Sequence, residues 1–392
     1  MIAEAAGELQ SFADAAFALK LAGVPITPRH VGRVAHELGA EMVQNRNDKA
    51  VQHRRRKLAA RVAAPPEVVA VEVDGGRLRT RAVGCGPGVH QPKNKEDKIA
   101  CLVTLKSDRH EQDPQPEPPP SFMEPRRVQR LVRGIKGLPG EHPDEGDEPE
   151  KASETTGAPK KAPRVREAPV RLVRTCVASM QNSKSFGPLM AAEAQERDFY
   201  RAKRRAFLGD GQAYNWSIQR GYFSDFEAIA DLLHVLCYIY LAAWAAGGSE
   251  LTRWSRYLDW LKACWQGRVI EVIEELRVWQ GKLGKPAAGE ELKEYDPRRL
   301  VAEALSYLRN NQQRMDYPRY RKEGLPITSS LVESLVGEFN TRVKGSQKFW
   351  NRPKGEGAET ILQIRAAVLS EDERLSRHLA QRPGSPYRRK PV

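Results

Sequence analysis

Apolar residues near the N-terminus recur at helical spacing. A stripe at i, i+3, i+4 and i+7 follows Thr27, a good N-cap, and Pro28, a good first helical residue: Val31, Val34, Ala35 and Leu38. An earlier stripe ends at Gly23, so residues 1–64 are predicted to be helical. Two helices joined by a short Gly/Pro turn fit a helix-turn-helix that reads a major groove. They fit an ordinary helical hairpin equally well, and the pattern leaves both alternatives open.

From residue 65 the apolar period becomes that of strands. Runs rich in valine and other apolar residues predict three strands, at about 67–73, 78–83 and 99–105. Asp74-Gly75-Gly76 between the first two is a hairpin signal. Residues 65–106 are therefore predicted to form a β-meander, with Asp74 at the end of a buried strand.

The segment 107–165 breaks this pattern because it is acidic, rich in proline and poor in large apolar residues. Such a segment cannot bury enough apolar surface to offset the entropy of ordering it. Most of it is predicted to be disordered, with room for a short helical piece around 128–135.

Periodic structure resumes near residue 170. The pattern predicts a helix from about 187, a short strand at 205–209 that ends at Asp210, and helices within 226–277 and 297–313. A loop at 324–330 leads into a last helix at about 331–344, and the tail 371–392 is basic and expected to be loose. Strands and helices interleaved in this way predict a mixed α/β fold.

Charge and composition narrow the classes of partner. Lys plus Arg number 64 against 50 Asp plus Glu, a formal net charge of +14, which favours a polyanionic partner. The N-terminus has no basic region before an apolar run, so a secretory signal is not expected. The longest apolar run, 235–246, is shorter than the ~18 residues of a membrane span. The five cysteines form no CxxC pair, which argues against common zinc sites and fits a reducing cytoplasm.

Three acidic residues stand at informative places. Asp74 and Asp210 each end a predicted strand, and Glu333 lies in the first turn of the last helix. Carboxylates brought together in this way can hold paired Mg²⁺ or Mn²⁺ ions for phosphodiester chemistry. Each also has an ordinary explanation, since Asp-Gly is a common turn dipeptide and Ser330-Leu-Val-Glu333 is a capping box.

Basic residues that could contact DNA gather in two places. The run after the N-terminal helices is most often a solvated surface, with contact to a DNA backbone as the sharper alternative. Near the last helix, cations and amides continue along the line of Glu333, and basic residues then alternate with aromatic ones, which either stack on nucleic acid or cap the core. The DNA-binding candidates are Arg54, Arg55, Arg56, Lys57, Arg77, Asn340, Lys344, Lys348, Trp350 and Arg352.

Three blocks that carry these acids resemble those of bacterial insertion-sequence transposases of the Kra type, related to the mutator-like branch of the DDE transposases. They are Val71-Glu-Val-Asp-Gly-Gly-Arg-Leu-Arg-Thr-Arg81, Phe207-Leu-Gly-Asp-Gly211 and Leu325-Pro-Ile-Thr-Ser-Ser-Leu-Val-Glu-Ser334. Flanking blocks at 173–180, 192–195 and 357–366 agree, so the resemblance spans roughly 65–106 and 168–370.

The resemblance implies an RNase H-like catalytic domain, a mixed α/β fold interrupted by an all-helical insertion. The helical N-terminal region predicted from the apolar pattern would precede it. Asp74, Asp210 and Glu333 would then be the DDE triad that holds Mg²⁺, with Mn²⁺ as a substitute. Related families carry an acidic-or-cysteine-xx-histidine motif, which Asp231-Leu-Leu-His234 matches. An accessory role for Asp231 and His234 and a satisfied core histidine remain alternatives. The acidic insert at 107–165 and the short region before Asp74 depart from the family pattern.

The expected organisation follows from these boundaries. Residues 65–106, 166–231 and 326–370 would form the catalytic domain, 232–325 the helical insertion, and 1–64, 107–165 and 371–392 the flanking regions and the insert. The expected function is that of a bacterial cytoplasmic DNA transposase, associated with the nucleoid when bound and acting as a dimer or higher oligomer on element ends and target DNA. The alternatives are a catalytically inactive DNA-binding relative and a nuclease that does not transpose.

Overall fold

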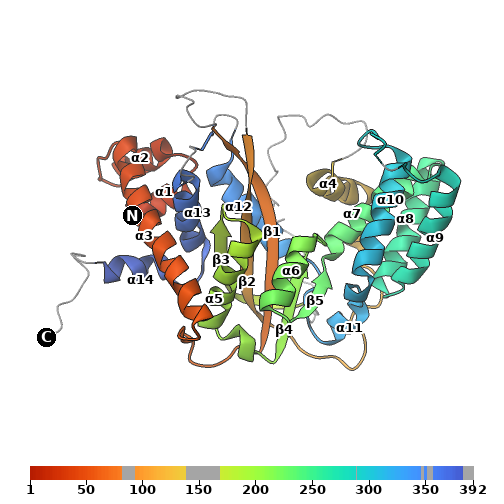
Figure 1. Cartoon of the computed structure of the whole chain (residues 1–392), viewed down its shortest axis with the longest axis horizontal. Helices are drawn as coiled ribbons and strands as arrows, with labels where there is room; N and C mark the ends of the chain where they lie inside the picture. Colours follow the sequence, from red (N-terminus) through yellow and green to blue (C-terminus); the bar gives the residue numbers. More distant parts are fainter. Residues whose placement is uncertain (82–92, 138–167, 288, 346–347, 351–355, 383–392) are drawn as a thin grey trace, which may run out of the picture. The chain divides into compact units, whose positions relative to one another are not determined.

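The computed structural model describes residues 1–81, 93–137, 168–287, 289–345, 348–350 and 356–382. The chain divides into two compact units, which we call unit 1 and unit 2. Unit 1 consists of Met1–Lys106, Val170–Ala228 and Thr328–Val392, and unit 2 of Ser107–Pro169 and Ile229–Ile327. With a five-stranded sheet and many helices, the protein has the predicted mixed α/β class (Figure 1).

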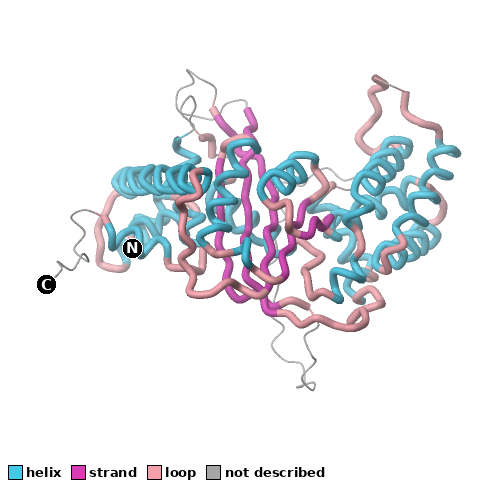
Figure 2. The backbone as a smooth tube through the Cα atoms, turned by 60° about the horizontal axis from the view of Figure 1, so that its bottom comes forward, coloured by secondary structure: helices cyan, strands magenta, loops and turns pink. Residues whose placement is uncertain are grey.

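Five strands in the order β3-β2-β1-β4-β5 form the sheet (Figure 2). They are β1 (Val68–Thr80), β2 (Lys93–Lys106), β3 (Val170–Ser179), β4 (Arg204–Gly209) and β5 (Glu227–Ala230). The β2 strand pairs antiparallel with both β1 and β3, whereas β4 pairs in parallel with β1. The sheet is therefore mixed, and β1, its central strand, pairs with partners of both directions.

The predicted hairpin at Asp74-Gly75-Gly76 is wrong, because β1 runs without a turn from Val68 to Thr80. Pairing with β2 continues through these residues: Asp74 lies opposite Ile99, and Gly76 lies opposite Asp97. A side chain at residue 75 would lie 2.9 Å from the backbone oxygen of Asp97. The glycines thus permit close approach of the neighbouring strand rather than a turn, and the three-strand meander predicted for 65–106 is two long strands.

Helices cover both faces of the sheet. Successive side chains along each strand point to alternate faces. Val69, Val71 and Val73 point into a core shared with α5 (Ser183–Glu196) and α6 (Ala213–Tyr222). Glu72, which points to the other face, contacts α12 (Ser330–Val343). The same unit contains α13 (Glu356–Leu369), which packs against β3. Two short elements complete this part: the 3₁₀ turn Phe199–Arg201 and α14 (Arg374–Gln381).

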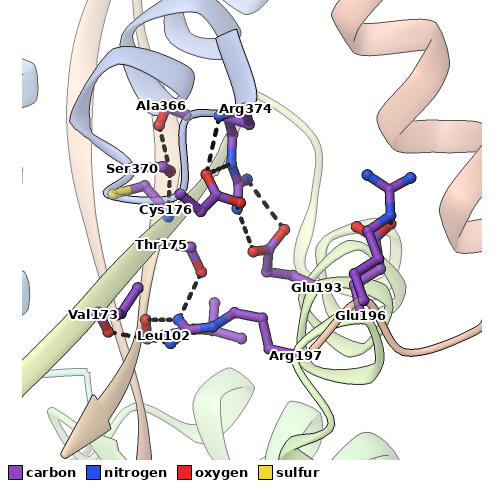
Figure 3. A network of polar contacts seen from close by, with 12 residues as sticks. Leu102, Val173, Thr175, Cys176, Glu193, Glu196, Arg197, Ala366, Ser370 and Arg374 are labelled. Carbon is purple, nitrogen blue, oxygen red and sulfur yellow. Dashed lines mark hydrogen bonds and ion pairs between the residues drawn. The ribbon is translucent and has the colours of Figure 1, made fainter. Parts of the chain in front are cut away.

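A buried polar network ties α5 and α14 to the sheet (Figure 3). Arg197, which follows α5, donates to the backbone oxygen of Leu102 in β2 at 2.6 Å and to Oγ1 of Thr175 in β3 at 2.9 Å. Burial lowers the pKa of the Arg197 guanidinium to about 10. Glu193 of α5 forms an ion pair with Arg374, whose Nη1 lies 3.1 Å from Oε2 of Glu193. These contacts fix the register between α5, β2 and β3.

Part of the predicted loose tail is ordered by this network. Arg374 begins α14, and its ion pair with Glu193 is buried within unit 1. Burial opposes the charge on Arg374, but Glu193 and Asp372 outweigh it and raise the pKa of the guanidinium. Residues 371–382 are therefore held against the core, while residues 383–392 lie outside the described part of the chain.

The N-terminal helices belong to unit 1 and do not form a unit of their own. They are α1 (Ile2–Glu8), α2 (Phe12–Leu21) and α3 (Pro28–Arg54), and the Thr27 side chain caps α3 as predicted. The long α3 contacts both α13 and α5. At Gly39 it approaches α13 so closely that a Cβ there would lie 2.5 Å from the backbone oxygen of Thr360. The stripe predicted from the sequence is thus the surface that α3 buries.

Substitution of Gly39 by alanine is expected to destabilise unit 1. The added methyl group would meet the backbone of Thr360, which cannot rotate away, so α3 and α13 must separate. Overpacking of this kind costs about 1–3 kcal/mol in the free energy of unfolding, measured by urea denaturation. Gly221→Ala in α6 is the matched control, because its Cβ meets nothing within 4 Å. Equal stability of the two variants would show that the α3–α13 packing is looser than described.

The described part of unit 2 is mainly helical, apart from the last two residues of β5. Its elements are the 3₁₀ turn Pro120–Phe122, α4 (Pro125–Ile135), α7 (Leu232–Ala245), α8 (Glu250–Trp265), α9 (Val269–Leu283), α10 (Pro297–Asn311), the 3₁₀ turn Gln312–Arg314 and α11 (Tyr317–Lys322). The second segment of unit 2, Ile229–Ile327, is close to the helical stretch 232–325 predicted from the sequence. None of the helices described in either unit has the length and apolarity that a membrane crossing requires.

The predicted disorder of 107–165 is wrong for residues 107–127, whereas the short helical piece expected around 128–135 is present as part of α4. Asp113 forms an ion pair with the buried Arg321, with a 2.8 Å contact from Nε to Oδ1, and the backbone oxygen of Gln115 accepts from Trp265 Nε1 at 2.8 Å. The amphipathic α4 buries Val128 and Val132. Composition suggested disorder because the segment has little core of its own, but unit 2 supplies the missing partners. Residues 138–167 lie outside the described residues.

Candidate functional site

Asp74 and Asp210 directly follow the last residue pair of the parallel ladder between β1 and β4. The ladder between β1 and β4 runs from Val68 with Arg204 to Val73 with Gly209. Each of these pairs has the sequence separation that also relates Asp74 to Asp210, so both aspartates directly follow its last pair. Because β4 ends there while β1 continues, the two lie next to each other at the carboxyl end of β4. The structure therefore brings together two of the three predicted acids.

Neighbouring amides hold the Asp210 carboxylate. Its Oδ1 accepts from the backbone N–H of Gln212 at 2.9 Å and from Nδ2 of Asn215 at 2.8 Å, and Oδ2 accepts from Nε2 of Gln212 at 2.7 Å. Asp74 Oδ1 accepts from the backbone N–H of Gly75 at 2.7 Å. The turn role that the ordinary interpretation gives to Asp210 is thus present, and it also orients the carboxylate.

Tyr214, at the start of α6, lies close to both aspartates. Burial raises the pKa of its phenol, and the negative charges of Asp210, Glu96 and Asp74 raise it further. The hydroxyl is 3.8 Å from the position that a Cβ at Gly75 would take. Tyr214 therefore remains neutral at physiological pH, and its ring lies beside the two carboxylates.

The first turn of α12, which carries Glu333, is anchored to β1. The backbone N–H of Val332 donates to Oε2 of Glu72 at 2.9 Å, and Glu72 is fully buried. Residues 72 and 74 lie two apart on an extended strand and so face the same side. Glu72 thus fixes the backbone of this turn beside the Asp74 position, although the side chain of Glu333 lies outside the described part.

The capping-box explanation of Glu333 does not fit this helix start. A capping box that includes Glu333 needs Ser330 as the N-cap, but the N-cap is Ser329, which makes no side-chain capping hydrogen bond. Glu72, from a different element, accepts the N–H of Val332 instead. Glu72 therefore takes the place of a capping serine side chain at the start of α12.

Glu338, the other acid on α12 that could compete for the third position, has a structural partner. Arg174 of β3 donates to its two carboxylate oxygens at 2.9 and 3.3 Å. Burial opposes the charge on Arg174, but Glu338 raises the pKa of the guanidinium above its ordinary value. Because Glu338 joins α12 to β3, it serves as a matched control for Glu333.

The sequence prediction missed an acid on β2. Asp97 lies opposite Gly76, is fully buried, and its carboxylate oxygens form no hydrogen bond with the described residues. Oδ1 of Asp97 and Nζ of Lys344 lie 2.8 and 3.1 Å from the position of a Cβ at Gly76. The predicted strand began at residue 99, so alternation within that run could not assign Asp97 to the face that also carries Asp74.

An Asp97→Asn variant is expected to be more stable than the parent at neutral pH. Burial raises the pKa of the Asp97 carboxyl, and Lys344 offsets this only in part. The unfolded chain therefore loses this proton first, and the folded state loses stability as pH rises from about 4 through the raised pKa. The gain for asparagine, about 1–2 kcal/mol, should shrink as pH falls toward 4. Chemical denaturation at pH 4 and pH 8 measures it, and a gain that is equal at both values contradicts this account.

The DNA-binding candidates near α12 fall into two groups. Lys348 Nζ donates to the backbone oxygens of Thr341 and Arg342 at 3.3 and 3.1 Å, and Trp350 Nε1 donates to that of Val343 at 2.9 Å. These two residues thus cap the end of α12. Asn340 and Lys344 are partly exposed on the same helix end. Arg352 lies outside the described residues.

The remaining basic candidates are exposed. Arg77 lies on β1 beyond Asp74 with an exposed side chain. Residues 54–57 are also exposed, at the end of α3 and just after it. The side chains of both groups are exposed to solvent. A solvated surface and a surface that contacts DNA both require such exposure.

Asp231 and His234 contact each other within unit 2. Asp231, fully buried, is the N-cap of α7 and accepts from the backbone N–H groups of Leu233 and His234. Its Oδ2 lies 2.6 Å from Nδ1 of His234. The motif therefore starts α7 and fixes the orientation of the imidazole ring.

Oxygen donors dominate this candidate site. Asp74 and Asp210 offer carboxylate oxygens, the ligand type that Mg²⁺ and Mn²⁺ prefer, so the donor set fits such an ion. Among the described side chains, no three of the His, Cys, Asp and Glu type are gathered closely enough to hold a metal. The side chain of Glu333 is not among those that the structure describes.

No protein-family model matches this chain, and neither does any curated protein.

Proposed function

We propose that the chain is a DNA transposase of the DDE type, which cuts the ends of its element and joins the freed 3′-OH to target DNA. The observation that carries the proposal is the β1–β4 register, which sets Asp74 beside Asp210. The Glu72 contact adds the first turn of α12 to the same face. Two of the three acids are thus neighbours by strand register, and the helix turn that carries the third is tied to the same strand, β1.

The arrangement of elements supports an RNase H-like interpretation of unit 1. The sheet is mixed, its first acid is on the central strand, and its second follows the adjacent parallel strand. Helices α7 to α11 of unit 2 lie in sequence between β5 and α12, where the resemblance expects an all-helical insertion. The flanking blocks of the resemblance also meet, since Glu359 of α13 accepts from the backbone N–H of Met180 at 2.6 Å.

Asp74, Asp210 and Glu333 would hold Mg²⁺, which when bound supplies nucleophile activation and stabilisation of the leaving oxygen. The protein itself positions these groups. Gln212 and Asn215 orient Asp210, and Glu72 fixes the helix turn that carries Glu333. Lys344, on the same side of β1, is available to a phosphate of the bound DNA. Pairing two element ends requires at least a dimer.

A strand-transfer assay tests the proposal. Labelled duplexes that end in the sequences flanking the gene are incubated with the protein, Mg²⁺ or Mn²⁺, and supercoiled target plasmid. The proposal expects metal-dependent nicking at the duplex ends and a joined product.

Two results would replace the proposal with one of its alternatives. Nicking without any joined product indicates a nuclease. DNA binding without metal-dependent nicking indicates a catalytically inactive DNA-binding protein.

A further inference from the structure

A stripe of arginines follows the outer face of α4 in unit 2. Arg126, Arg130 and Arg133 recur at i, i+4 and i+7 and are exposed, and Arg127 is exposed beside them. Val128 and Val132, on the opposite side, are buried. The helix carries no acid within its bounds, so its solvent side is a continuous positive surface.

An aromatic pocket of about 390 Å³ adjoins this stripe. Tyr240 and Trp244 of α7 and Trp254 of α8 line it, together with Pro125 and Gln129 of α4. On the helical wheel, Gln129 lies between the buried valines and the arginine stripe. The pocket therefore opens beside the positive surface.

The pocket wall combines packed aromatic rings with polar groups. Trp254 stacks on the buried Tyr257, with ring centroids 5.0 Å apart. The guanidinium of Arg253 lies 5.4 Å from the ring centroid of Trp244, and its buried Nε has no hydrogen-bond partner among the described residues. Gln129 and Glu250 add an amide and a carboxylate to the lining.

We infer that this pocket binds one unpaired base of a DNA strand, whose adjacent phosphates contact the α4 arginines. Aromatic side chains offer flat surfaces on which any base stacks, and arginines bind the phosphates that accompany it. Amide and carboxylate groups can pair with the polar edge of a base. The proposal rests on the proposed function only for the choice of DNA, and it involves none of the three acids.

Other partners of a basic amphipathic helix fit the structure less well. Binding to a membrane surface needs an exposed apolar face, but the valines of α4 are buried within unit 2. An acidic protein segment would match the arginines and leave the aromatic pocket without a ligand.

The test measures binding of the full chain to a duplex with a short single-stranded tail that carries 2-aminopurine, in EDTA so that no cleavage occurs. Stacking in the pocket quenches the 2-aminopurine fluorescence. Trp244→Ala is expected to abolish the quenching and weaken tail binding about 10- to 100-fold, since one base–aromatic stack is lost. Trp244→Phe should restore most of both.

Charge reversal tests the other half of the site. Arg126→Glu combined with Arg130→Glu should weaken binding strongly and flatten the salt dependence of the binding constant. Arg277→Glu, an exposed arginine on α9, is the matched control and should have little effect. Tail binding by the arginine variant equal to that of the parent overturns the proposal, as does quenching that persists in Trp244→Ala.

Failure of this proposal can be told from failure of the proposed function. Tail binding is measured without metal, and strand transfer is measured with it. If the parent cuts and joins DNA while the α4 and Trp244 variants bind the tail normally, only the base site is wrong. Preferential binding of vesicles that contain anionic lipid, with no binding of the tailed duplex, also overturns the base site.

Discussion

An Asp74→Asn variant is expected to lose Mg²⁺-dependent DNA cleavage by at least about 10³-fold while retaining DNA binding. The asparagine keeps the size of the side chain and removes the charge that a divalent cation requires. Loss of several kcal/mol of transition-state stabilisation corresponds to this reduction, at 1.36 kcal/mol for each tenfold. The same loss is expected for Asp210→Asn and Glu333→Gln. Initial rates on labelled duplex ends measure the effect, and band-shift titration measures binding.

Glu338→Gln provides the control within the same helix. Glu338 forms an ion pair with Arg174. Replacement of Glu338 should therefore lower the free energy of unfolding while leaving the metal-dependent cleavage rate within a few-fold of that of the parent. If Glu338→Gln abolished cleavage while Glu333→Gln cut normally, the third acid would be Glu338. Normal cleavage by Asp74→Asn would remove the DDE proposal altogether.

A Glu72→Ala variant is expected to lose both stability and metal response. Glu72 is buried and accepts the N–H of Val332 at the start of α12, so its removal leaves that donor without this acceptor. The cost is about 1–3 kcal/mol in the free energy of unfolding. Because the turn that carries Glu333 then loses its anchor, the Mg²⁺ concentration for half-maximal cleavage should rise about 10- to 100-fold.

Glu72→Gln separates positioning from simple destabilisation. Its amide oxygen can still accept the Val332 N–H, so the Mg²⁺ midpoint should stay close to that of the parent. If the alanine variant loses stability but keeps the parental Mg²⁺ midpoint, Glu72 supports the fold alone and does not position the site.

The sequence by itself predicted the elements that depend on local interactions. The helix predicted at about 331–344 is present as α12, and Val332, Leu335 and Phe339, at i, i+3 and i+7 along it, are fully buried. The short strand before Asp210 and the cap at Thr27 are also present. These features depend on residues a few positions apart, so their periodicity and capping chemistry suffice to identify them.

Contacts between distant residues decided the rest. Whether Asp74-Gly75-Gly76 forms a turn depends on β2, which pairs with all three residues and keeps β1 extended. The segment around Asp113 and Gln115 is held by Arg321 and Trp265, which lie far along the chain.

At the candidate site, too, the sequence identified residues, and contacts between distant residues decided how they are arranged. The sequence named Asp74, Asp210 and Glu333 by type and position, but only the strand register set the first two side by side. Glu72, Asp97 and the Arg174 partner of Glu338 were not foreseen, because a buried carboxylate is recognised by what surrounds it. Local propensity extends over a few residues, whereas burial and ion pairing are properties of the assembled fold.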